Sequence, residues 1–354
     1  MPACIIQPME FKLLSTQEDW NEIKPEWDAL LNESITPSPF LSHSYLSHWW
    51  QSAGGGEWKA FDRQLCIIVA YENGNLLGIA PLFAWHDTET NLWQMGFIGQ
   101  VEVSDYLDFI VREADLQRFL TGWLNYIQNA HALPGKKMML ANIINTSPTV
   151  AALTQLSQEK NWKCETEVLE VAPYIPLAQS FEAYLAQIDK KQRHEIRRKL
   201  RNAQSKAKVE LQFVSQPETL EENIAHFIHL MGQDAGKAQF LSPDMVAFFE
   251  GFIQKSFAQG HLVFSWLSID GQRASGYLSI IQNDTLYVYN SCWDPAFATY
   301  SPGWVHLGLL IDWAISQELG EVDMMRGDEI YKYRFGGIDR QVLALRLSTP
   351  KVFS

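Results

Sequence analysis

The sequence contains few cysteines and lacks the features of an exported or membrane-spanning chain. Its four cysteines (Cys4, Cys66, Cys164 and Cys292) lie far apart, with no C-x-x-C pair and no histidine at a zinc-like spacing. The N-terminal residues show no basic segment followed by an apolar one, and no run of about 18 apolar residues occurs anywhere. We therefore expect a reduced, cytoplasmic protein without a metal site or a transmembrane segment.

Positive charge is also scarce. Lysine and arginine total 28 against 41 aspartates and glutamates, which gives a net charge of −13. The long-range field of such a chain repels nucleic acid and anionic lipid, so we expect no DNA partner. One segment departs from this average, because nine lysines and arginines lie between Lys190 and Lys208 with the single acid Glu195.

A long internal repeat suggests two similar halves. The 354 residues exceed one ordinary core and suit two domains, while the absence of repeats of about 20–50 residues excludes solenoids and propellers. Phe40-Leu41-Ser42 and Phe240-Leu241-Ser242 each open a helix-like stretch. About 30 residues later, each half shows a strand, a tight turn and a second strand, with Asn73-Gly74 and Asp270-Gly271 at the turns.

The repeated order of helix, hairpin and further strand predicts an α/β fold with mixed sheets. Each half would have a central mixed β-sheet flanked by helices, with boundaries at residues 1–172 and 173–354. The alternative is chance, because apolar hairpins are common in α/β proteins.

The remaining elements follow from hydrophobic periodicity. In the first half we expect strands at residues 92–98, 105–111, 137–144 and 163–171, and helices at residues 114–131 and 149–160. In the second half we expect one long helix over residues 181–208 capped by Ser180, further helices at residues 217–231, 243–259 and 304–318, and strands at residues 285–291 and 322–325.

The loop before the helix at residues 304–318 is a candidate anion site. It ends in Tyr300, Ser301, Pro302 and Gly303. A strand followed by a short glycine-containing loop and a helix offers backbone N–H groups and the positive end of the helix dipole to an anion. Tyr300, Ser301 and Gly303 are therefore candidate cofactor-binding residues. The alternative is an ordinary helix start, with Ser as cap and Pro near the first position.

A second candidate site follows the predicted strand at residues 322–325. Ligands of open α/β sheets gather outside the carboxyl ends of strands. Asp323 or Asp328 would act as general base, Tyr331 would protonate a leaving group, and Lys332 and Arg334 would bind an anion. The alternatives are a solvated charged loop, a capping or bracing role for one of the two aspartates and, for Tyr331, packing.

The basic segment predicts a charged helix face. Lys190, Arg193, Arg197 and Arg201 follow helical spacing beside an apolar stripe. This row of basic side chains is either a solvated face or a recognition surface for an anionic acceptor, such as a nucleotide-sugar, a phospholipid headgroup or tRNA. Arg193 and Arg197 are the candidate substrate-binding residues.

Three segments of the second half together resemble a known family. They are the basic stretch Lys190–Arg201, the block at residues 290–303 that begins Asn-Ser-Cys-Trp-Asp-Pro, and the block at residues 323–332 that reads Asp-Met-Met-Arg-Gly-Asp-Glu-Ile-Tyr-Lys. Residues 180–340 resemble the GNAT-like acetyltransferase domain of the CelD type, which is related to Fem-type aminoacyl transferases. The first half is similar to the degenerate N-terminal half of such proteins in residues 27–31 and 39–50.

The resemblance implies transfer of an acyl group, usually acetyl, from acetyl-CoA or another acyl-CoA. The acceptor would be an amine or hydroxyl of a carbohydrate, glycan or peptidoglycan precursor, attacked directly. No G-x-S-x-G nucleophile elbow occurs, in agreement with direct attack. It also implies that Lys332 contacts phosphate or developing charge, and it makes Trp293 and Asp294 candidate substrate-binding residues.

Two alternatives to acyl-CoA chemistry stay open. The pyrophosphate loop of the GNAT family is replaced by Thr299-Tyr-Ser-Pro-Gly303. The donor could therefore be aminoacyl-tRNA, as in Fem-type enzymes. The other alternative is a non-catalytic binding protein with the same fold.

Overall fold

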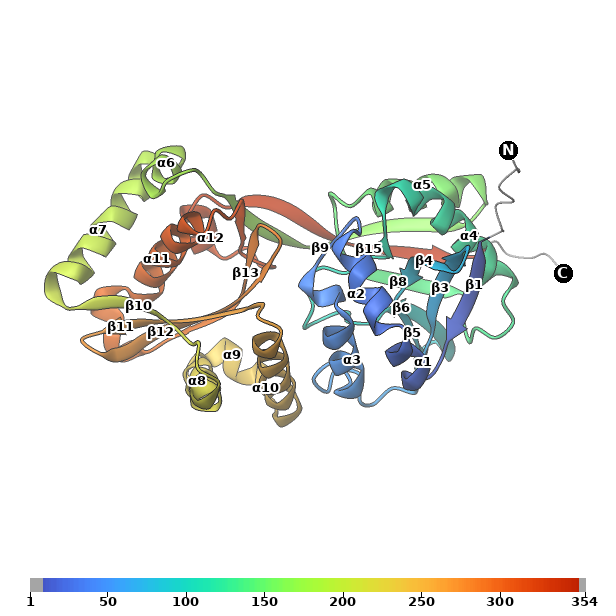
Figure 1. Ribbon diagram of the computed structural model, residues 1–354, viewed down its shortest axis with the longest axis horizontal. Helices are drawn as coiled ribbons and strands as arrows, with labels where there is room; N and C mark the ends of the chain where they lie inside the picture. Colours follow the sequence, from blue (N-terminus) through green and yellow to red (C-terminus); the bar gives the residue numbers. More distant parts are fainter. Residues whose placement is uncertain (1–8, 350–354) are drawn as a thin grey trace. The chain divides into compact units, whose positions relative to one another are not determined.

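The computed structural model describes residues 9–349, which divide into two compact units. Unit 1 comprises residues 9–170 with 341–349, and unit 2 comprises residues 171–340. Strand β9 (Lys163–Pro176) leads from unit 1 into unit 2, and β15 (Ile338–Ser348) leads back (Figure 1). The predicted second half extended to residue 354, whereas here the last strand adds to the sheet of unit 1 beside β8.

Unit 1 contains two sheets with helices packed against them. Its helices are α1 (Gln17–Glu22), α2 (Lys24–Asn32), α3 (His43–Gln51), α4 (Leu116–Asn129) and α5 (Pro148–Glu159), with 3-10 helices η1 (Pro39–Leu41) and η2 (Glu113–Asp115). Its strands are β1 (Glu10–Leu14), β2 (Arg63–Leu65), β3 (Ile67–Glu72), β4 (Asn75–Ala80), β5 (Leu82–Asp87), β6 (Leu92–Phe97), β7 (Ile110–Val111) and β8 (Lys137–Ile144), together with parts of β9 and β15. The strand orders are β1-β3-β4-β7 and β15-β8-β6-β5-β2.

Unit 2 has one sheet with the strand order β10-β11-β12-β13-β14-β9. Its strands are β10 (Val209–Phe213), β11 (Leu262–Ile269), β12 (Gln272–Gln282), β13 (Thr285–Trp293) and β14 (Glu321–Asp323), with the end of β9. Its helices are α6 (Phe181–Gln187), α7 (Lys190–Lys206), α8 (Pro217–Met231), α9 (Ala235–Phe240), α10 (Pro243–Ala258), α11 (Pro302–Ser316) and α12 (Ile330–Arg334), with the 3-10 helix η3 (Pro295–Tyr300). Figure 1 shows α7 and α11 on one face of this sheet and α8 and α10 on the other.

The predicted repeat is confirmed at its helix starts and its hairpins. The Ser42 hydroxyl accepts the backbone N–H of Tyr45 at the start of α3, and Ser242 caps α10 in the same way. The β3–β4 and β11–β12 turns contain Asn73-Gly74 and Asp270-Gly271, and all four residues have positive φ. A two-residue type I′ hairpin requires this conformation.

The two units also share a sheet plan. The antiparallel order β1-β3-β4-β7 in unit 1 matches β10-β11-β12-β13 in unit 2: each has a first strand, then the two strands of a hairpin, then a fourth strand. In each unit a helix, α4 or α11, follows the fourth strand. Parallel pairing of β13 with β14 and of β6 with β8 makes the sheets mixed. The predicted α/β class with two similar halves is confirmed.

The predicted strand at residues 105–111 is wrong over most of its length, because only Ile110–Val111 form a strand. The buried carboxylate of Asp108 accepts hydrogen bonds from the hydroxyls of Thr36, Ser147 and Thr149. Side-chain bonds therefore hold this segment where strand pairing was expected.

The predicted single helix at residues 181–208 is also wrong, because it breaks into α6 and α7. Ile188 adopts an extended conformation, with φ −82° and ψ 151°, and its side chain is buried. Asp189 then caps α7, since its carboxylate accepts the backbone N–H groups of Lys191 at 2.9 Å and Gln192 at 3.3 Å. A side chain that bonds to its own backbone competes with helix continuation.

We expect Asp189→Ala to lower the free energy of unfolding by about 1 kcal/mol, because two N–H groups of α7 lose their acceptor. Urea denaturation of the full chain measures the change. Asp189→Asn retains a capping oxygen and should lose much less. Equal losses for both substitutions would contradict a capping role.

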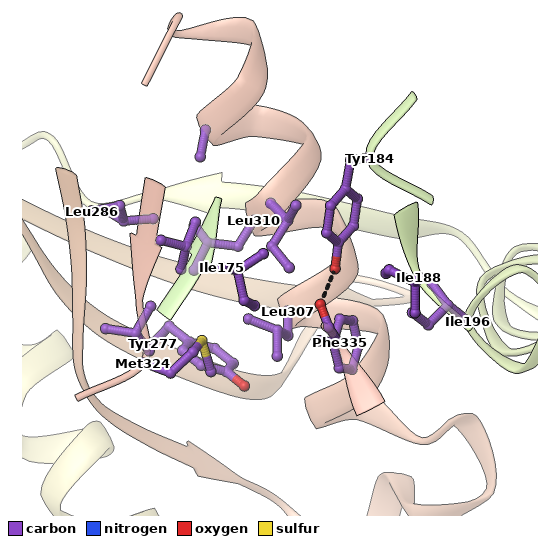
Figure 2. Packing of buried hydrophobic residues seen from close by; sticks show 14 of the residues in the cluster. Ile175, Tyr184, Ile188, Ile196, Tyr277, Leu286, Leu307, Leu310, Met324 and Phe335 are labelled. Carbon is purple, nitrogen blue, oxygen red and sulfur yellow. Dashed lines mark hydrogen bonds between the residues drawn. The ribbon is translucent and has the colours of Figure 1, made fainter. Parts of the chain in front are cut away.

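The core of unit 2 fixes the helices around the end of the sheet. Figure 2 shows Ile175 of β9, Leu307 of α11 and Tyr277 of β12 within one buried cluster. The Tyr184 hydroxyl donates a 2.7 Å hydrogen bond to the Phe335 carbonyl, shown as a dashed line. This hydrogen bond joins α6 to the C-terminal end of α12. It therefore helps to fix the position of α12, which follows β14 in the chain.

Every helix within residues 9–349 is too short or too polar to span a bilayer.

Candidate functional site

The site begins where β13 and β14 stop pairing. The two strands run parallel and pair only over Thr285–Tyr287 and Glu321–Asp323, while β13 continues to Trp293. The register on β12 shifts at the same place: Leu278 faces Asn290 and Ser279 faces Val288. Tyr289 is therefore the extra residue of a β-bulge, which bends β13. The carboxyl end of β13 consequently forms one side of an opening in the sheet.

A pocket of about 290 Å³ lies at this opening. Tyr277 of β12 and Trp293 of β13 form one part of its lining. Trp304 of α11, Tyr331 of α12 and Lys237 of α9 contribute others. The walls thus combine aromatic and other apolar side chains with a few polar groups, Asp234 among them, as is typical of small-molecule sites.

A second pocket of about 300 Å³ adjoins the first at the start of α11. Both are lined by Trp293, Gly303 and Trp304, and the second adds Lys199 and Ser301. Because they share these walls at the N-terminal end of α11, we refer to the two neighbouring pockets together as the cleft.

The start of α11 is shaped to receive a ligand. Ser301 adopts the left-handed conformation, with φ 54°, and its side chain does not cap the helix. A Cβ atom added to Gly303 would have no atom within 4 Å, so the space beside the helix end is open. Lys199 Nζ lies 3.3 Å from Ser301 Oγ and 4.3 Å from the centre of the Trp304 ring. The backbone N–H of Ser301 donates to the Ala298 carbonyl at 3.0 Å, so the Gly303 N–H, the helix dipole and the Lys199 ammonium are the groups that converge here.

Of the three predicted cofactor-binding residues, Ser301 and Gly303 line the cleft. Tyr300 lies elsewhere: it packs against the apolar cluster that contains Ala203 and Leu267.

Lys332 of α12 is buried, and its ammonium is hydrogen-bonded to the loop that follows β14. Its side chain is 3% exposed, and Nζ donates to the carbonyls of Met325 at 3.1 Å, Arg326 at 2.6 Å and Gly327 at 3.1 Å. Nζ also lies 2.8 Å from the Glu329 carboxylate. This geometry indicates that Lys332 stabilises the conformation of the loop after β14. The predicted contact of Lys332 with phosphate stays a prediction.

Asp323 and Asp328, predicted as candidate bases, do not line either pocket. Asp323 is buried and accepts the backbone N–H of Met325 at 2.8 Å, and its other oxygen lies 3.4 Å from Arg340 Nη1. Asp328 is exposed on the loop before α12. Their predicted role as base is not tested by this geometry.

Tyr331 and Trp293 do line the main pocket. Burial is the largest cause of the raised pKa of Tyr331, and the Glu329 carboxylate adds to it, so the phenol is protonated at neutral pH. Asp294 instead caps η3 by accepting the Ala296 N–H at 2.8 Å.

The predicted basic residues divide into two groups. Arg197 pairs with Glu182 of α6, and Arg193 Nη1 lies 3.4 Å from the Ala186 carbonyl, so both are directed to α6. Arg334 lies near Lys199: burial is the largest cause of the lowered pKa of that lysine, and the Arg334 charge also lowers it. Arg334 therefore adds positive charge close to the start of α11.

Sequence reasoning missed Lys199 and Lys237 as site residues. Lys199 was one of nine cations with no feature to distinguish it. Lys237 lies in a short helix without a motif, and only the fold brings it to the end of β13. Within residues 9–349, no group of three or more His, Cys, Asp or Glu side chains is placed to hold a metal ion.

Residues 190–333 match the family model of the acetyltransferase (GNAT) domain. The match covers all three segments that carried the resemblance in the second half, and it confirms that resemblance.

Solved structures resemble the whole chain at low identity. The crystal structure of FemX is 11% identical, with a TM-score of 0.67, and the alignment covers 95% of this chain and 96% of FemX. A conserved protein of unknown function from Bacteroides thetaiotaomicron VPI-5482 is 13% identical, with a TM-score of 0.60 and coverage of 97% and 100%. The C-terminal domain of a putative lysylphosphatidylglycerol synthetase from Agrobacterium fabrum is 9% identical, with a TM-score of 0.51 and coverage of 92% of each chain. These likenesses show the fold. No curated protein sequence matches the chain.

Proposed function

We propose that unit 2 is an acyltransferase that moves an acyl group from acyl-CoA to an amine or hydroxyl. The observation that carries the proposal is the cleft at the opening between β13 and β14, which passes the N-terminal end of α11. The donor phosphates would lie against the N–H group of Gly303, the hydroxyl of Ser301 and the ammonium of Lys199. The acyl arm would pass between Trp293 and Trp304 into the main pocket.

The chemistry would be direct attack within the main pocket. The acceptor nitrogen or oxygen forms a bond to the acyl carbon, and the carbon–sulfur bond breaks. The leaving thiolate takes a proton, for which the protonated phenol of Tyr331 is the candidate donor, and the phenolate so formed would regain a proton from the acceptor nitrogen or oxygen, which loses one as its bond to the acyl carbon forms. Backbone N–H groups at the bulged edge of β13 would stabilise the carbonyl oxygen as it gains charge.

Aminoacyl transfer from aminoacyl-tRNA is the second candidate. It is favoured by the fold likeness to FemX and by the basic helix α7, where Lys190, Lys191 and Arg198 are exposed. Thermal stabilisation by acetyl-CoA would favour the first candidate, because a ligand of the folded state raises Tm. Binding of tRNA that weakens steeply with salt, without any effect of acetyl-CoA, would favour the second.

Gly303→Leu tests the proposed donor site. A leucine at this position meets no atom within 4 Å at its Cβ, so the protein should fold, but the side chain would fill the cleft beside α11. We expect acetyl-CoA binding, measured by calorimetry, to weaken at least about tenfold, which corresponds to about 1.4 kcal/mol. Unchanged binding would place the donor elsewhere.

Gly308→Ala is the matched control on the same helix. Its added Cβ would make ordinary contact with Leu200, with the nearest atom at 3.5 Å. It lies outside both pockets, so this variant should bind acetyl-CoA as the wild type does. Circular dichroism melting of both variants separates loss of the site from loss of the fold.

A further inference from the structure

Lys237 presents an ammonium group to the main pocket from α9. Its Nζ donates to Asn290 Oδ1 at 2.9 Å and to the carbonyl of Ser291. Both acceptors belong to the end of β13, next to the bulge. The lysine therefore reaches from a helix on one face of the sheet to the strand that borders the opening.

The ammonium has no carboxylate partner among residues 9–349. Both of its acceptors are neutral, and no acidic oxygen lies within ion-pair distance of Nζ. An ammonium has three N–H donors, so one is left without a protein acceptor in this part of the chain. Asp234 is the nearest acid in sequence, but its Oδ1 accepts the backbone N–H groups of Gly236 and Lys237, and its side chain is exposed.

One acid, Asp234, also lines the pocket, but its carboxylate is bonded to the backbone at the start of α9 and is not within ion-pair distance of Lys237 Nζ. The remaining titratable groups, a thiol and two phenols, carry no negative charge at neutral pH. Burial raises the pKa of the Cys292 thiol to about 12. Burial also raises the pKa of Tyr277 and of Tyr331, so both phenols are protonated. The charges of Asp234 and Glu329 act to raise the pKa of Lys237, and the charge of Lys332 acts to lower it.

An ammonium without an ion-paired carboxylate in a partly buried pocket favours an anionic ligand. Two neutral acceptors hold Nζ, and burial is the largest cause of the lowered pKa of Lys237. An anion that accepts the remaining N–H would restore part of the lost solvation and add an attractive charge pair.

We propose that Lys237 binds a carboxylate of the acceptor, so that unit 2 acts on molecules with a carboxylate near the reacting amine or hydroxyl. The acceptor part of this statement rests on the proposed acyl transfer. One free N–H donor and aromatic walls suit a planar carboxylate with an apolar body. A phosphate carries more charge and needs more donors, and the phosphates of the donor have their own seat at Lys199, Ser301 and Gly303.

Paired small probes test the anion site without any assumption about the donor. Calorimetry with the full chain would compare benzoate with benzamide, which has a similar shape but no charge. We expect the wild type to bind benzoate about tenfold to a hundredfold more tightly than benzamide. Lys237→Met should abolish this difference, whereas Lys237→Arg should retain part of it. Lys255→Met is the control for net charge, because Lys255 is exposed on α10 and lies outside the pocket.

The outcomes separate this inference from the proposed function. Equal binding of benzoate and benzamide by the wild type would overturn the carboxylate site, whatever acetyl-CoA does. Tighter binding of phenyl phosphate than of benzoate would overturn the assignment to a carboxylate. A preference for benzoate that survives in a folded Lys237→Met protein would overturn the role of Lys237. Failure of acetyl-CoA to bind, with the benzoate preference intact, would count against acyl-CoA as donor and leave the anion site standing.

Discussion

Replacement of Lys332 by methionine is expected to lower the free energy of unfolding by about 3–5 kcal/mol, the range for breaking a buried charge interaction. The Lys332 side chain is 3% exposed, and its ammonium satisfies the carbonyls of Met325, Arg326 and Gly327. Methionine retains the volume but leaves these three acceptors without their donor. Each buried acceptor that loses its partner costs about 1–3 kcal/mol, although water that reaches the loop would reduce the sum.

Urea denaturation of the full chain measures this effect, and two variants separate its causes. Glu329→Gln removes only the half-exposed partner and should cost less than about 1 kcal/mol. Lys255→Met removes an exposed lysine of α10 and should have little effect. A Lys332→Met protein of wild-type stability that has lost acyl transfer would instead support the contact with phosphate or developing charge that the sequence suggests.

The sequence predicts those parts of the fold that local interactions decide. The turn residues Asn73-Gly74 and Asp270-Gly271 adopt positive φ almost independently of context, so both hairpins could be predicted. Ser42 and Ser242 cap their helices through bonds to residues three positions away. The helix α8 and the strand β8 have the predicted bounds, because their hydrophobic patterns are long and regular.

Errors occurred where side-chain bonds override periodicity. The apolar stripe of residues 181–208 continues through Ile188, yet the Asp189 carboxylate makes a cap and the helix breaks. Burial of Asp108 among three hydroxyls replaces a strand that its neighbours favoured. Both outcomes depend on partners that no local pattern contains.

The candidate site was predicted as a region and less well as a set of side chains. The opening at the end of the sheet follows from topology, so Ser301, Gly303 and Tyr331 could be placed near it. The direction of a long side chain depends on tertiary contacts. For this reason the sequence did not show that the Lys332 ammonium bonds to the loop after β14, and it did not identify Lys237 as a residue that lines the pocket.

Acid is expected to destabilise the chain through His306, which is buried on α11. Its Nε2 lies 2.9 Å from Ser265 Oγ and its Nδ1 lies 3.2 Å from Ser275 Oγ. Ser275 donates its own hydrogen to the Cys292 carbonyl at 3.0 Å, so it must accept from Nδ1, and Ser265 donates to Nε2. The imidazole is therefore held neutral, and burial lowers its pKa from 6.5 to about 3.

The sign of the effect follows from proton uptake. Below pH 6.5 the unfolded chain binds a proton at His306 that the folded chain rejects until about pH 3. The free energy of unfolding should therefore fall by about 1.4 kcal/mol for each pH unit between these values, or about 3 kcal/mol from pH 7 to pH 4.

Urea denaturation at pH 7 and pH 4, with wild type and His306→Gln compared, isolates this contribution from that of other groups. The variant should be less stable at pH 7, because it loses the hydrogen bonds that the imidazole makes with the hydroxyls of Ser265 and Ser275. Its free energy of unfolding should, however, fall less as the pH is lowered. His194→Gln, on the exposed part of α7, should follow the wild type. If the free energy of unfolding falls equally with acid in the wild type and in His306→Gln, His306 takes up its proton in the folded chain over the same pH range as in the unfolded chain, and the prediction is wrong. The centre of the His306 ring lies 4.7 Å from the centre of the Tyr277 ring, and Tyr277 lines the main pocket. We therefore expect the wild type to lose stability and ligand binding over the same pH range.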